Sequence, residues 1–459
     1  MPSSRTQPAR GMRDFLPADV RKREYVIGVI KEVYERYGFE PLETPAVENI
    51  ETLLGKYGEE GNQLIFKILK RGEHEKSGEA DLALRYDLTV PLARVVAQYQ
   101  NELPKFFKRY QIQPVWRADR PARGRFREFY QCDVDVLGSR SMVVEAEILA
   151  AASDVLTKLR FDGFTIRLNH RQVLAAALAE TTQDKHEGAL VALDKLDRIG
   201  KEGVYEEFNA RGIDSAAPRK LLELLWQTSE KYAFGNEQDQ STDLESYNAD
   251  ILSGLQDSIG DHEQAKHGIV ELKKILEYSK ATAADGHIKI DPSLARGLSY
   301  YTGAIMEIRV RDLAGSLGGG GRYDNLVGMF LGKDVPACGF SLGLERIIVV
   351  MTERGMFPSE LVSSPADVMV TIWNEDSVAE SLALATELRK QGLRVDLYPE
   401  ADKMGKQFKY ASSRGISFVA IVGDDERVRG EVAIKDLRSG EQRSVKRNEV
   451  AAAIRDKES

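Results

Sequence analysis

The sequence predicts an α+β domain built on a mainly antiparallel sheet flanked by helices, with a helical insertion and a C-terminal α/β domain. Three observations support this fold class. Strand-like runs in the first part of the chain lack the βαβ rhythm of a parallel sheet. A stretch rich in Ala, Leu, Glu and Lys occupies residues 173–284. After residue 367, strand and helix patterns alternate.

The first part of the chain combines two amphipathic helices with strand-like segments. Residues 17–37 place apolar side chains on one helical face, with Pro17 in the first turn and Gly38 as the stop. Residues 141–160 show the same periodicity. Apolar, β-branched and aromatic residues in near alternation predict strands at 82–88, 128–137, 287–291 and 301–310.

Composition divides the chain into four parts. A length of 459 residues is consistent with about three domains. We expect a split α+β domain at 1–172 and 285–355 and a mostly helical insertion at 173–284. A linker with two Pro at 356–366 then precedes the α/β domain at 367–459.

Composition and charge exclude several classes of protein. The chain is 42% hydrophobic and 30% charged, with a net charge of −8, which excludes a disordered chain and a globally basic nucleic-acid binder. Two widely separated Cys exclude a disulfide framework and favour small buried residues in a reducing cytoplasm. No signal-peptide core is present, and no apolar run reaches the ~20 residues that span a bilayer. We therefore expect a cytoplasmic protein without a membrane partner.

Basic residues concentrate in one segment of this acidic chain. Residues 104–127 contain eight Lys or Arg and a single acid, Asp119, a local balance of +7. The turn sequence ADRPARGR lies between two strand-like runs, and guanidinium groups bind phosphate oxygens in a bidentate geometry. Gln131, Asp133 and Asp135 follow on one strand face. A solvated arginine loop is the alternative, but carboxylates on a buried face need cationic or hydrogen-bonding partners.

Two further segments add chemistry to this region. The segment LARGLSYYTG places Arg296 before a strand, with Tyr300 and Tyr301 expected on opposite faces. The segment ACGFSLGLERIIVV runs from a glycine-rich strand into an apolar helix, with Arg346 near the junction. A guanidinium beside a helix N-terminus suits a triphosphate. Taken alone, a Tyr-Tyr pair is more often part of a core and a Glu-Arg pair more often a surface ion pair.

Motifs of other chemistries are missing. The sequence has no G-x-x-x-x-G-K-[ST] pattern, and the glycine cluster at 315–324 lacks G-x-G-x-x-G spacing. A tight hairpin or close backbone packing explains that cluster better. His262 and His267 are five residues apart and fall on different helix faces, so we interpret them as solvated residues rather than zinc ligands. A dehydrogenase is therefore a poor alternative.

Together these segments resemble class II aminoacyl-tRNA synthetases, and specifically the histidyl-tRNA synthetase family. Residues 10–48, 116–131 and 339–347 resemble the class motifs 1, 2 and 3. Residues 84–94 and 294–303 resemble two signatures of the histidine enzymes. The resemblance implies a cytoplasmic homodimer that ligates L-histidine to tRNA(His) with ATP. The reaction would pass through a histidyl-adenylate and release AMP and diphosphate.

The resemblance also implies roles for individual residues. Arg117 and Arg296 would be catalytic and hold the α-phosphate from opposite sides. Phe129 would stack on adenine and Arg346 would hold the γ-phosphate. The implied ATP-binding residues are Arg117, Asp119, Arg125, Phe129 and Arg346. The implied histidine-binding residues are Asp87, Thr89, Gln131, Asp135, Arg296, Tyr300, Tyr301 and Tyr323. Mg²⁺ is expected only together with ATP, without a dedicated metal site in the protein.

The implied histidine pocket departs from the bacterial pattern in side-chain length. Asp135 and Tyr301 would read the imidazole nitrogens, and Tyr323 would close the pocket. Asp87 and Asp135 stand where many bacterial relatives have Glu. Because Asp is shorter, the pocket backbone must lie closer to the substrate or a water must intervene.

A catalytically silent alternative also belongs to this family. It is the histidine-binding regulatory subunit of ATP phosphoribosyltransferase, which typically lacks the C-terminal domain and the active-site arginines. Arg117, Arg296, Arg346 and residues 367–459 are all present, which argues against it. The resemblance assigns anticodon binding to the C-terminal domain, where four basic residues form either an RNA-binding patch or a solvated helix surface: Lys403, Lys406, Lys409 and Arg414.

Overall fold

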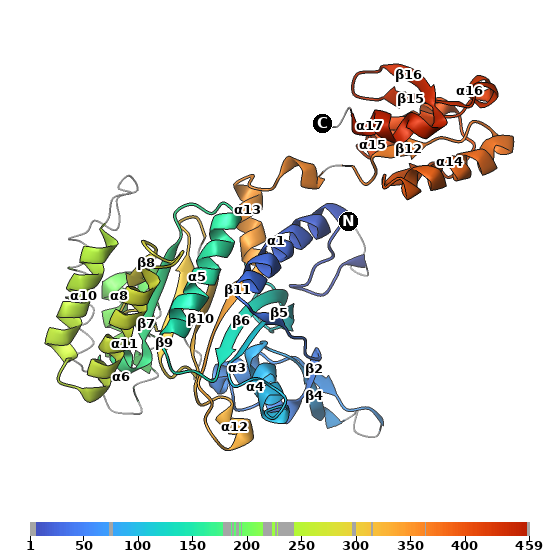
Figure 1. The fold of residues 1–459 in the computed structure, drawn as a ribbon. Helices are drawn as coiled ribbons and strands as arrows, with labels where there is room; N and C mark the ends of the chain where they lie inside the picture. The colour runs from blue at the N-terminus through green and yellow to red at the C-terminus, as the bar shows by residue number, and fades with distance from the viewer. Residues whose placement is uncertain are drawn as a thin grey trace. The chain divides into compact units, whose positions relative to one another are not determined.

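A computed structural model describes most of the chain, in two compact units, Met1–Phe357 and Pro358–Ser459 (Figure 1). The described residues are 6–72, 77–177, 185, 188–189, 192–193, 195–213, 223–224, 227, 243–295, 300–313, 315–362 and 364–456. Within these ranges, every helix is too short or too polar to cross a lipid bilayer.

The first unit is organised around an eight-stranded sheet. In sheet order the strands are β1 (Glu40–Pro41), β5 (Phe107–Trp116), β6 (Glu128–Leu137), β11 (Ala337–Gly343), β10 (Gly318–Arg322), β9 (Ala304–Arg309), β7 (Thr165–His170) and β8 (Ile288–Ile290). Only the two edge pairs, β1 with β5 and β7 with β8, are parallel. The other neighbours are antiparallel, so the predicted mainly antiparallel sheet is confirmed.

Alternation along β6 gives the sheet one apolar face and one polar face. Cys132 and Val134 are fully buried in the main hydrophobic core of the unit. The intervening Gln131, Asp133 and Asp135 line a cavity on the opposite face. Because successive strand residues point to opposite faces, one ten-residue strand supplies both the core and the polar wall.

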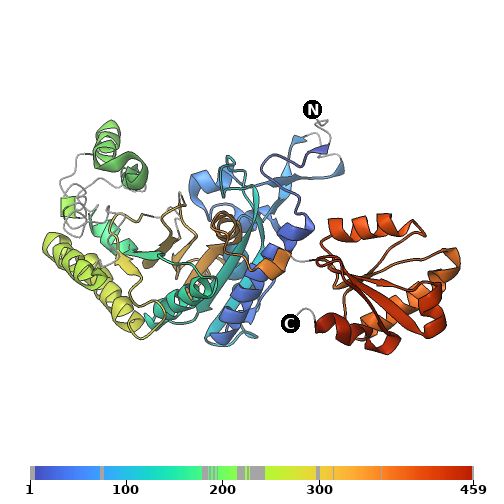
Figure 2. The same ribbon diagram turned by 90° about the horizontal axis from the view of Figure 1, so that it is seen from above.

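Helices cover the apolar face. The helices α1 (Pro17–Arg36), α5 (Val143–Lys158) and α13 (Leu344–Glu353) form one layer against the sheet (Figure 2). Proline at the first position of α1 removes no intrahelical hydrogen bond, because that N–H has no helical partner. Gly38 ends the helix with a positive φ of 75°.

A three-stranded sheet and short helices lie beside the polar face. They comprise β2 (Val47–Asn49), α2 (Ile50–Leu53), α3 (Gly58–Gln63), β3 (Lys67–Leu69), β4 (Ala80–Leu84) and α4 (Thr89–Gln98). The strand predicted at 82–88 ends earlier, at Leu84. The reason is local, because the Asp87 carboxylate accepts the Val90 N–H at 3.0 Å and turns the chain into α4.

The described part of the segment predicted as an insertion is helical. It contains α6 (Arg171–Ala177), α8 (Leu196–Ala210), α10 (Leu244–Ile259) and α11 (Glu263–Ser279). Apolar residues of α10 and α11 join the main core of the unit. These two helices are therefore packed into the first unit rather than held on a separate core.

The glycine cluster forms β10, in the middle of the eight-stranded sheet. A Cβ on Gly320 would lie 2.0 Å from the carbonyl oxygen of Gly339. Such a distance is far below van der Waals contact, so only glycine lets β10 pass β11 this closely. The expectation of close backbone packing is confirmed.

The second unit has a five-stranded sheet of its own. Its order is β13 (Val395–Leu397), β12 (Val368–Val370), β14 (Phe418–Ile421), β15 (Glu431–Asp436) and β16 (Gln442–Lys446). The first three strands are parallel and the last two antiparallel. The helices are α14 (Val378–Lys390), α15 (Met404–Ser413), α16 (Asp424–Arg429) and α17 (Val450–Arg455). The order β12, α14, β13, α15, β14, with all three strands parallel, gives the predicted α/β pattern.

Candidate active site

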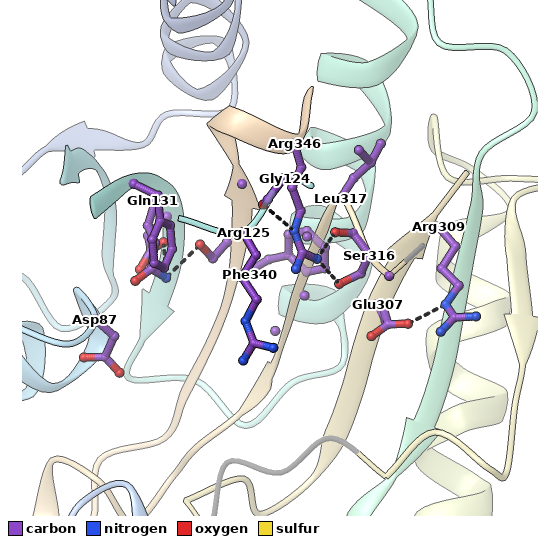
Figure 3. A pocket seen from close by; sticks show the side chains of 18 of the residues that line it. Asp87, Gly124, Arg125, Gln131, Glu307, Arg309, Ser316, Leu317, Phe340 and Arg346 are labelled. Carbon is purple, nitrogen blue, oxygen red and sulfur yellow. Dashed lines mark hydrogen bonds and ion pairs between the residues drawn. The ribbon is translucent and has the colours of Figure 1, made fainter. Parts of the chain in front are cut away.

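A cavity of about 850 Å³ opens on the polar face of the eight-stranded sheet (Figure 3). Its walls come from β6, β9, β10 and β11, and from the chain before α4. Every predicted site residue that the structure describes lines this one cavity: Asp87, Thr89, Arg117, Asp119, Arg125, Phe129, Gln131, Asp135, Tyr300, Tyr301, Tyr323 and Arg346. Arg296 lies outside the described residues.

One end of the cavity is acidic. Asp87 is buried and accepts the Tyr57 hydroxyl at 3.0 Å and the Tyr300 hydroxyl at 3.4 Å, in addition to the Val90 N–H. Burial raises the pKa of Asp87, while these hydrogen bonds and the nearby Arg117 oppose the rise. The carboxylate is therefore positioned by three donors and can face a cationic group in the cavity.

The wall formed by β6 carries two more buried carboxylates. Burial raises the pKa of Asp133 to about 7, and it raises the pKa of Asp135 as well. The Arg109 guanidinium behind the wall opposes both shifts, with Nη2 2.8 Å from Asp135. Tyr323 donates its hydroxyl to Asp135, and the Gln131 amide donates to Ser341.

Aromatic rings close the same end. Tyr300 contacts Tyr301 edge to face at 5.1 Å and Tyr323 at 6.0 Å between ring centroids. The expectation that Tyr300 and Tyr301 point to opposite faces is wrong. Strand β9 begins only at Ala304, so the strand alternation assumed for the two tyrosines does not apply, and both rings line the cavity.

The other end is cationic. Arg117 donates to the carbonyl oxygen of Tyr86 at 3.0 Å, and its guanidinium lies 5.2 Å from the Phe129 ring centroid. Arg346 donates to the carbonyl oxygens of Ser316 and Gly124, as Figure 3 shows. These carbonyls fix two guanidinium groups at the cavity wall, a geometry suited to phosphate oxygens.

The basic segment does not act as a single patch. Arg117, Arg123 and Arg125 line the cavity, whereas Arg109 is fully buried in the ion pair with Asp135. Lys108 binds Glu147 at 2.8 Å. Arg109 and Lys108 are therefore paired with carboxylates of the protein itself, on β6 and α5, and only part of the basic segment faces the cavity.

Sequence reasoning missed several residues of the cavity. Glu307 and Arg309 on β9 lie at its rim and are joined by a 2.8 Å hydrogen bond (Figure 3). Asp133 was placed on the correct strand face but was given no role. The i, i+2 spacing of Glu307 and Arg309 was the available signal, since it puts both on one strand face.

The two Cys are buried and His267 is exposed to solvent, as the sequence predicted. Cys132 and Cys338 are buried and unbonded. His267 is 61% exposed on α11. Within the described ranges, no group of three His, Cys, Asp or Glu residues is arranged to hold a metal ion.

Comparison with known proteins agrees with the geometry. Residues 11–347 match the family model of histidyl-tRNA synthetase, and residues 367–457 match that of the anticodon binding domain. Histidine--tRNA ligase of Christiangramia forsetii is 41% identical, covering 97% of this chain and 98% of the relative. That of Cytophaga hutchinsonii is 40% identical, covering 96% and 97%.

Solved structures show the same fold. Histidyl-tRNA synthetase from Nostoc sp. PCC 7120 has a TM-score of 0.78 and 32% identity, covering 98% of this chain and 99% of that one. An ATP phosphoribosyltransferase regulatory subunit/histidyl-tRNA synthetase from Bacillus halodurans has a TM-score of 0.73 at 20% identity, covering 92% and 100%. At that identity the likeness shows the fold alone.

The antiparallel sheet, its polar cavity and the C-terminal anticodon-binding domain define a class II aminoacyl-tRNA synthetase. The chain belongs to the histidyl-tRNA synthetase family and is an aminoacyl-tRNA ligase. The silent regulatory subunit is not favoured, because the relatives named histidine--tRNA ligase match nearly the whole chain.

Proposed function

We propose that the cavity joins L-histidine to ATP and then transfers histidine to tRNA(His). The observation that carries this proposal is one continuous cavity that is lined by buried carboxylates and tyrosines together with arginines. A zwitterionic amino acid with an imidazole ring suits the carboxylates and tyrosines, and a triphosphate suits the arginines.

At the acidic end, Asp87, Thr89 and Gln131 bind the α-ammonium group of histidine. Asp135 accepts an imidazole N–H, and Tyr301 contacts the other ring nitrogen. Buried polar groups of this kind reject amino acids that leave them unpaired. The hydrogen bonds that already hold Asp87 and the ion pair behind Asp135 support these roles.

At the cationic end, Arg117 contacts the α-phosphate and the histidine carboxylate together. Arg125 and Asp119 contact the nucleotide, Phe129 stacks on adenine and Arg346 holds the γ-phosphate. Arg296 holds the α-phosphate opposite Arg117. Mg²⁺ binds with ATP, and its positive charge neutralises part of the phosphate charge.

The chemistry follows from this placement. A histidine carboxylate oxygen attacks the α-phosphorus, the bond to the bridging oxygen of the β-phosphate breaks, and diphosphate leaves. Both reactants are anions, so positioning and cationic stabilisation matter more than a general base. A ribose hydroxyl at the tRNA 3′ end then attacks the histidyl carbonyl carbon and AMP leaves.

The second unit binds the anticodon. The enzyme works in the cytoplasm as a homodimer. Its helical insertion spans residues 173–284. In the second unit, Lys406 is paired with Asp402 at 2.7 Å and Arg414 donates to the Tyr410 hydroxyl at 2.6 Å. These two members of the basic patch therefore also have partners within the protein. We expect Lys403 and Lys409 to contact the RNA together with them. A tRNA with a substituted anticodon that is charged as well as tRNA(His) would count against this role.

The deciding experiment is ATP–diphosphate exchange with each of the twenty amino acids in turn. Exchange with histidine alone, together with charging of tRNA(His), is the expected result. Exchange driven by another amino acid would overturn the assignment of the pocket. Stable co-purification with an ATP phosphoribosyltransferase and no charging would favour the regulatory alternative. Arg296→Ala should abolish exchange, and robust exchange by that variant would remove the role given to Arg296.

A further inference from the structure

A buried guanidinium lies behind the acidic wall of the cavity. Arg109 on β5 is the direct register partner of Asp135 on β6. Its side chain is 0% exposed and does not line the cavity. Its Nη2 lies 2.8 Å from Oδ2 of Asp135 and 3.9 Å from Oδ2 of Asp133. Arg109 can therefore act on a bound substrate only through these carboxylates.

Arg109 has fewer hydrogen-bond partners than a buried arginine with a purely structural role. Nε and Nη1 have no hydrogen-bond partner within the described part of the chain, and Nη2 otherwise reaches only the Leu88 carbonyl oxygen, at 3.5 Å. Arg85, which is also buried, instead donates to five acceptors of the scaffold: the carbonyl oxygens of Thr44, Pro45 and Pro114, the Thr44 hydroxyl and the side chain of Gln113. Unpaired buried donors are unfavourable. The attraction to the carboxylates is therefore the interaction that stabilises the buried Arg109 guanidinium.

The Asp135 carboxylate needs this cation. Burial raises its pKa, and Asp87 raises it further, whereas Arg109 and the Tyr323 hydroxyl lower it. The titratable groups near it come from β5, β6, β11, α1, the residue after β10 and the chain before α4, namely Arg109, Asp133, Cys338, Tyr34, Tyr323 and Asp87. Arg109 is the only cation among these groups.

The shape of the site restricts where Asp135 can move. A Cβ on Gly339 would lie 1.9 Å from Oδ1 of Asp135, so the carboxylate occupies the space beside the β11 backbone. The Tyr323 hydroxyl contacts the same oxygen, and Arg109 faces the other oxygen. These contacts on both oxygens and the adjacent β11 backbone restrict the rotation of the Asp135 carboxylate.

We propose that Arg109 is a positioning residue for histidine selection, which holds Asp135 as an anion aimed at the imidazole ring. This inference rests on the proposed role of Asp135. A protonated Asp135 would carry a donor in place of an acceptor and would no longer accept an imidazole N–H. Loss of the Arg109 charge therefore weakens histidine binding and leaves the residues proposed to bind ATP in place.

The test measures histidine and ATP KM separately, in ATP–diphosphate exchange from pH 6 to 9. Arg109→Gln should raise the histidine KM about tenfold near pH 7, the effect of a shift of one pKa unit. The ATP KM should stay within about twofold, and the acidic limb of the histidine kcat/KM profile should move to higher pH. Arg109→Lys, which keeps a cation in place, should recover most of the histidine affinity.

Arg85→Gln is the matched control, since it also removes a buried guanidinium. It should lower the unfolding midpoint without changing the ratio of the two KM values or the pH profile. If Arg109→Gln behaves in the same way as Arg85→Gln, the role of Arg109 is structural and the inference fails. If Arg109→Gln does not fold, Arg109→Met, which is uncharged and has a long unbranched side chain, carries the test: a raised histidine KM with an unchanged ATP KM supports the inference, and an unchanged histidine KM overturns it.

A double substitution separates this inference from the proposed function. Asp135→Asn should raise the histidine KM. Adding Arg109→Gln to it should cause little further change, because Arg109 affects histidine binding only through the Asp135 carboxylate. If Asp135→Asn leaves the histidine KM unchanged, the assignment of Asp135 is wrong. If Asp135→Asn raises it while Arg109→Gln does not, only the inference on Arg109 is wrong.

Discussion

Arg23 in helix α1 donates to Glu345 in helix α13 at 2.9 Å, across 322 residues of sequence. The second oxygen of Glu345 accepts the backbone N–H of Tyr130 at 2.9 Å. Tyr130 follows Phe129, and Glu345 precedes Arg346, so one buried carboxylate connects α1 to two of the residues proposed to hold ATP. The contact couples the packing of the helical layer to the position of the nucleotide site.

Glu345→Gln should lower stability and raise the ATP KM together. The substitution leaves the Arg23 charge buried without its counter-ion, a loss of about 3–5 kcal/mol for pairs of this kind. Arg23→Gln is the control, because it breaks the same ion pair but keeps the acceptor of the Tyr130 N–H. We expect it to lower stability with a smaller change in ATP KM. Urea unfolding and exchange kinetics measure both effects, and equal ATP KM changes would contradict the coupling.

Acid should weaken the first unit through Asp291. Burial alone would raise the pKa of Asp291, but Arg167, 2.6 Å away, and Lys289 outweigh it and bring the pKa to about 2. A depressed carboxyl pKa stabilises the fold above its unfolded value near 3.8, and this stabilisation is lost as the pH falls toward 2. Asp291→Asn should therefore lower the free energy of unfolding by roughly 2 kcal/mol at pH 7. The difference from the wild type should shrink at pH 3, and a difference independent of pH would refute the ion-pair origin.

Glycine at position 320 should be indispensable to the sheet. A Cβ there would lie 2.0 Å from a backbone oxygen, which cannot move without separating β10 from β11. Gly320→Ala should destabilise the first unit by at least ~3 kcal/mol, the upper range for an overpacked core. Gly28→Ala in helix α1 is the matched control, since a Cβ there meets no atom within 4 Å. That variant should gain up to about 1 kcal/mol from helix propensity. Thermal unfolding of both variants tests the contrast.

Local patterns predicted the elements of this fold better than the contacts between them. Alternation along 128–137 located β6 and the shared face of Gln131, Asp133 and Asp135, because side-chain period is a local property. The ion pair of Arg109 with Asp135 could not be predicted, since it depends on the register between two strands. The same alternation failed at Tyr300 and Tyr301, where the chain is not yet a strand. The family motifs, by contrast, brought together residues from distant segments that periodicity alone leaves unconnected.

Two arginines of one turn should differ in their importance for ATP. Arg125 pairs with Asp119 at 2.6 Å inside the cavity, whereas Arg123 forms an ion pair with Glu353 on helix α13. Arg123 is half exposed, and exposed pairs contribute at most about 1 kcal/mol. Arg125→Gln should raise the ATP KM at least ~10-fold, as expected when a charge-assisted phosphate contact is lost.

Arg123→Gln, in the same turn, should change the ATP KM by less than about threefold, because its guanidinium is already bound to the scaffold. The histidine KM, measured in the same exchange assay, is the internal control and should stay constant in both variants. An ATP KM raised equally in the two variants would mean that the turn rearranges on ATP binding and releases Arg123 from Glu353, and an ATP KM unchanged in both would remove the role given to Arg125. A charge-swapped Arg123→Glu, Glu353→Arg pair would then identify that rearrangement, since restoring the ion pair would leave the ATP KM impaired.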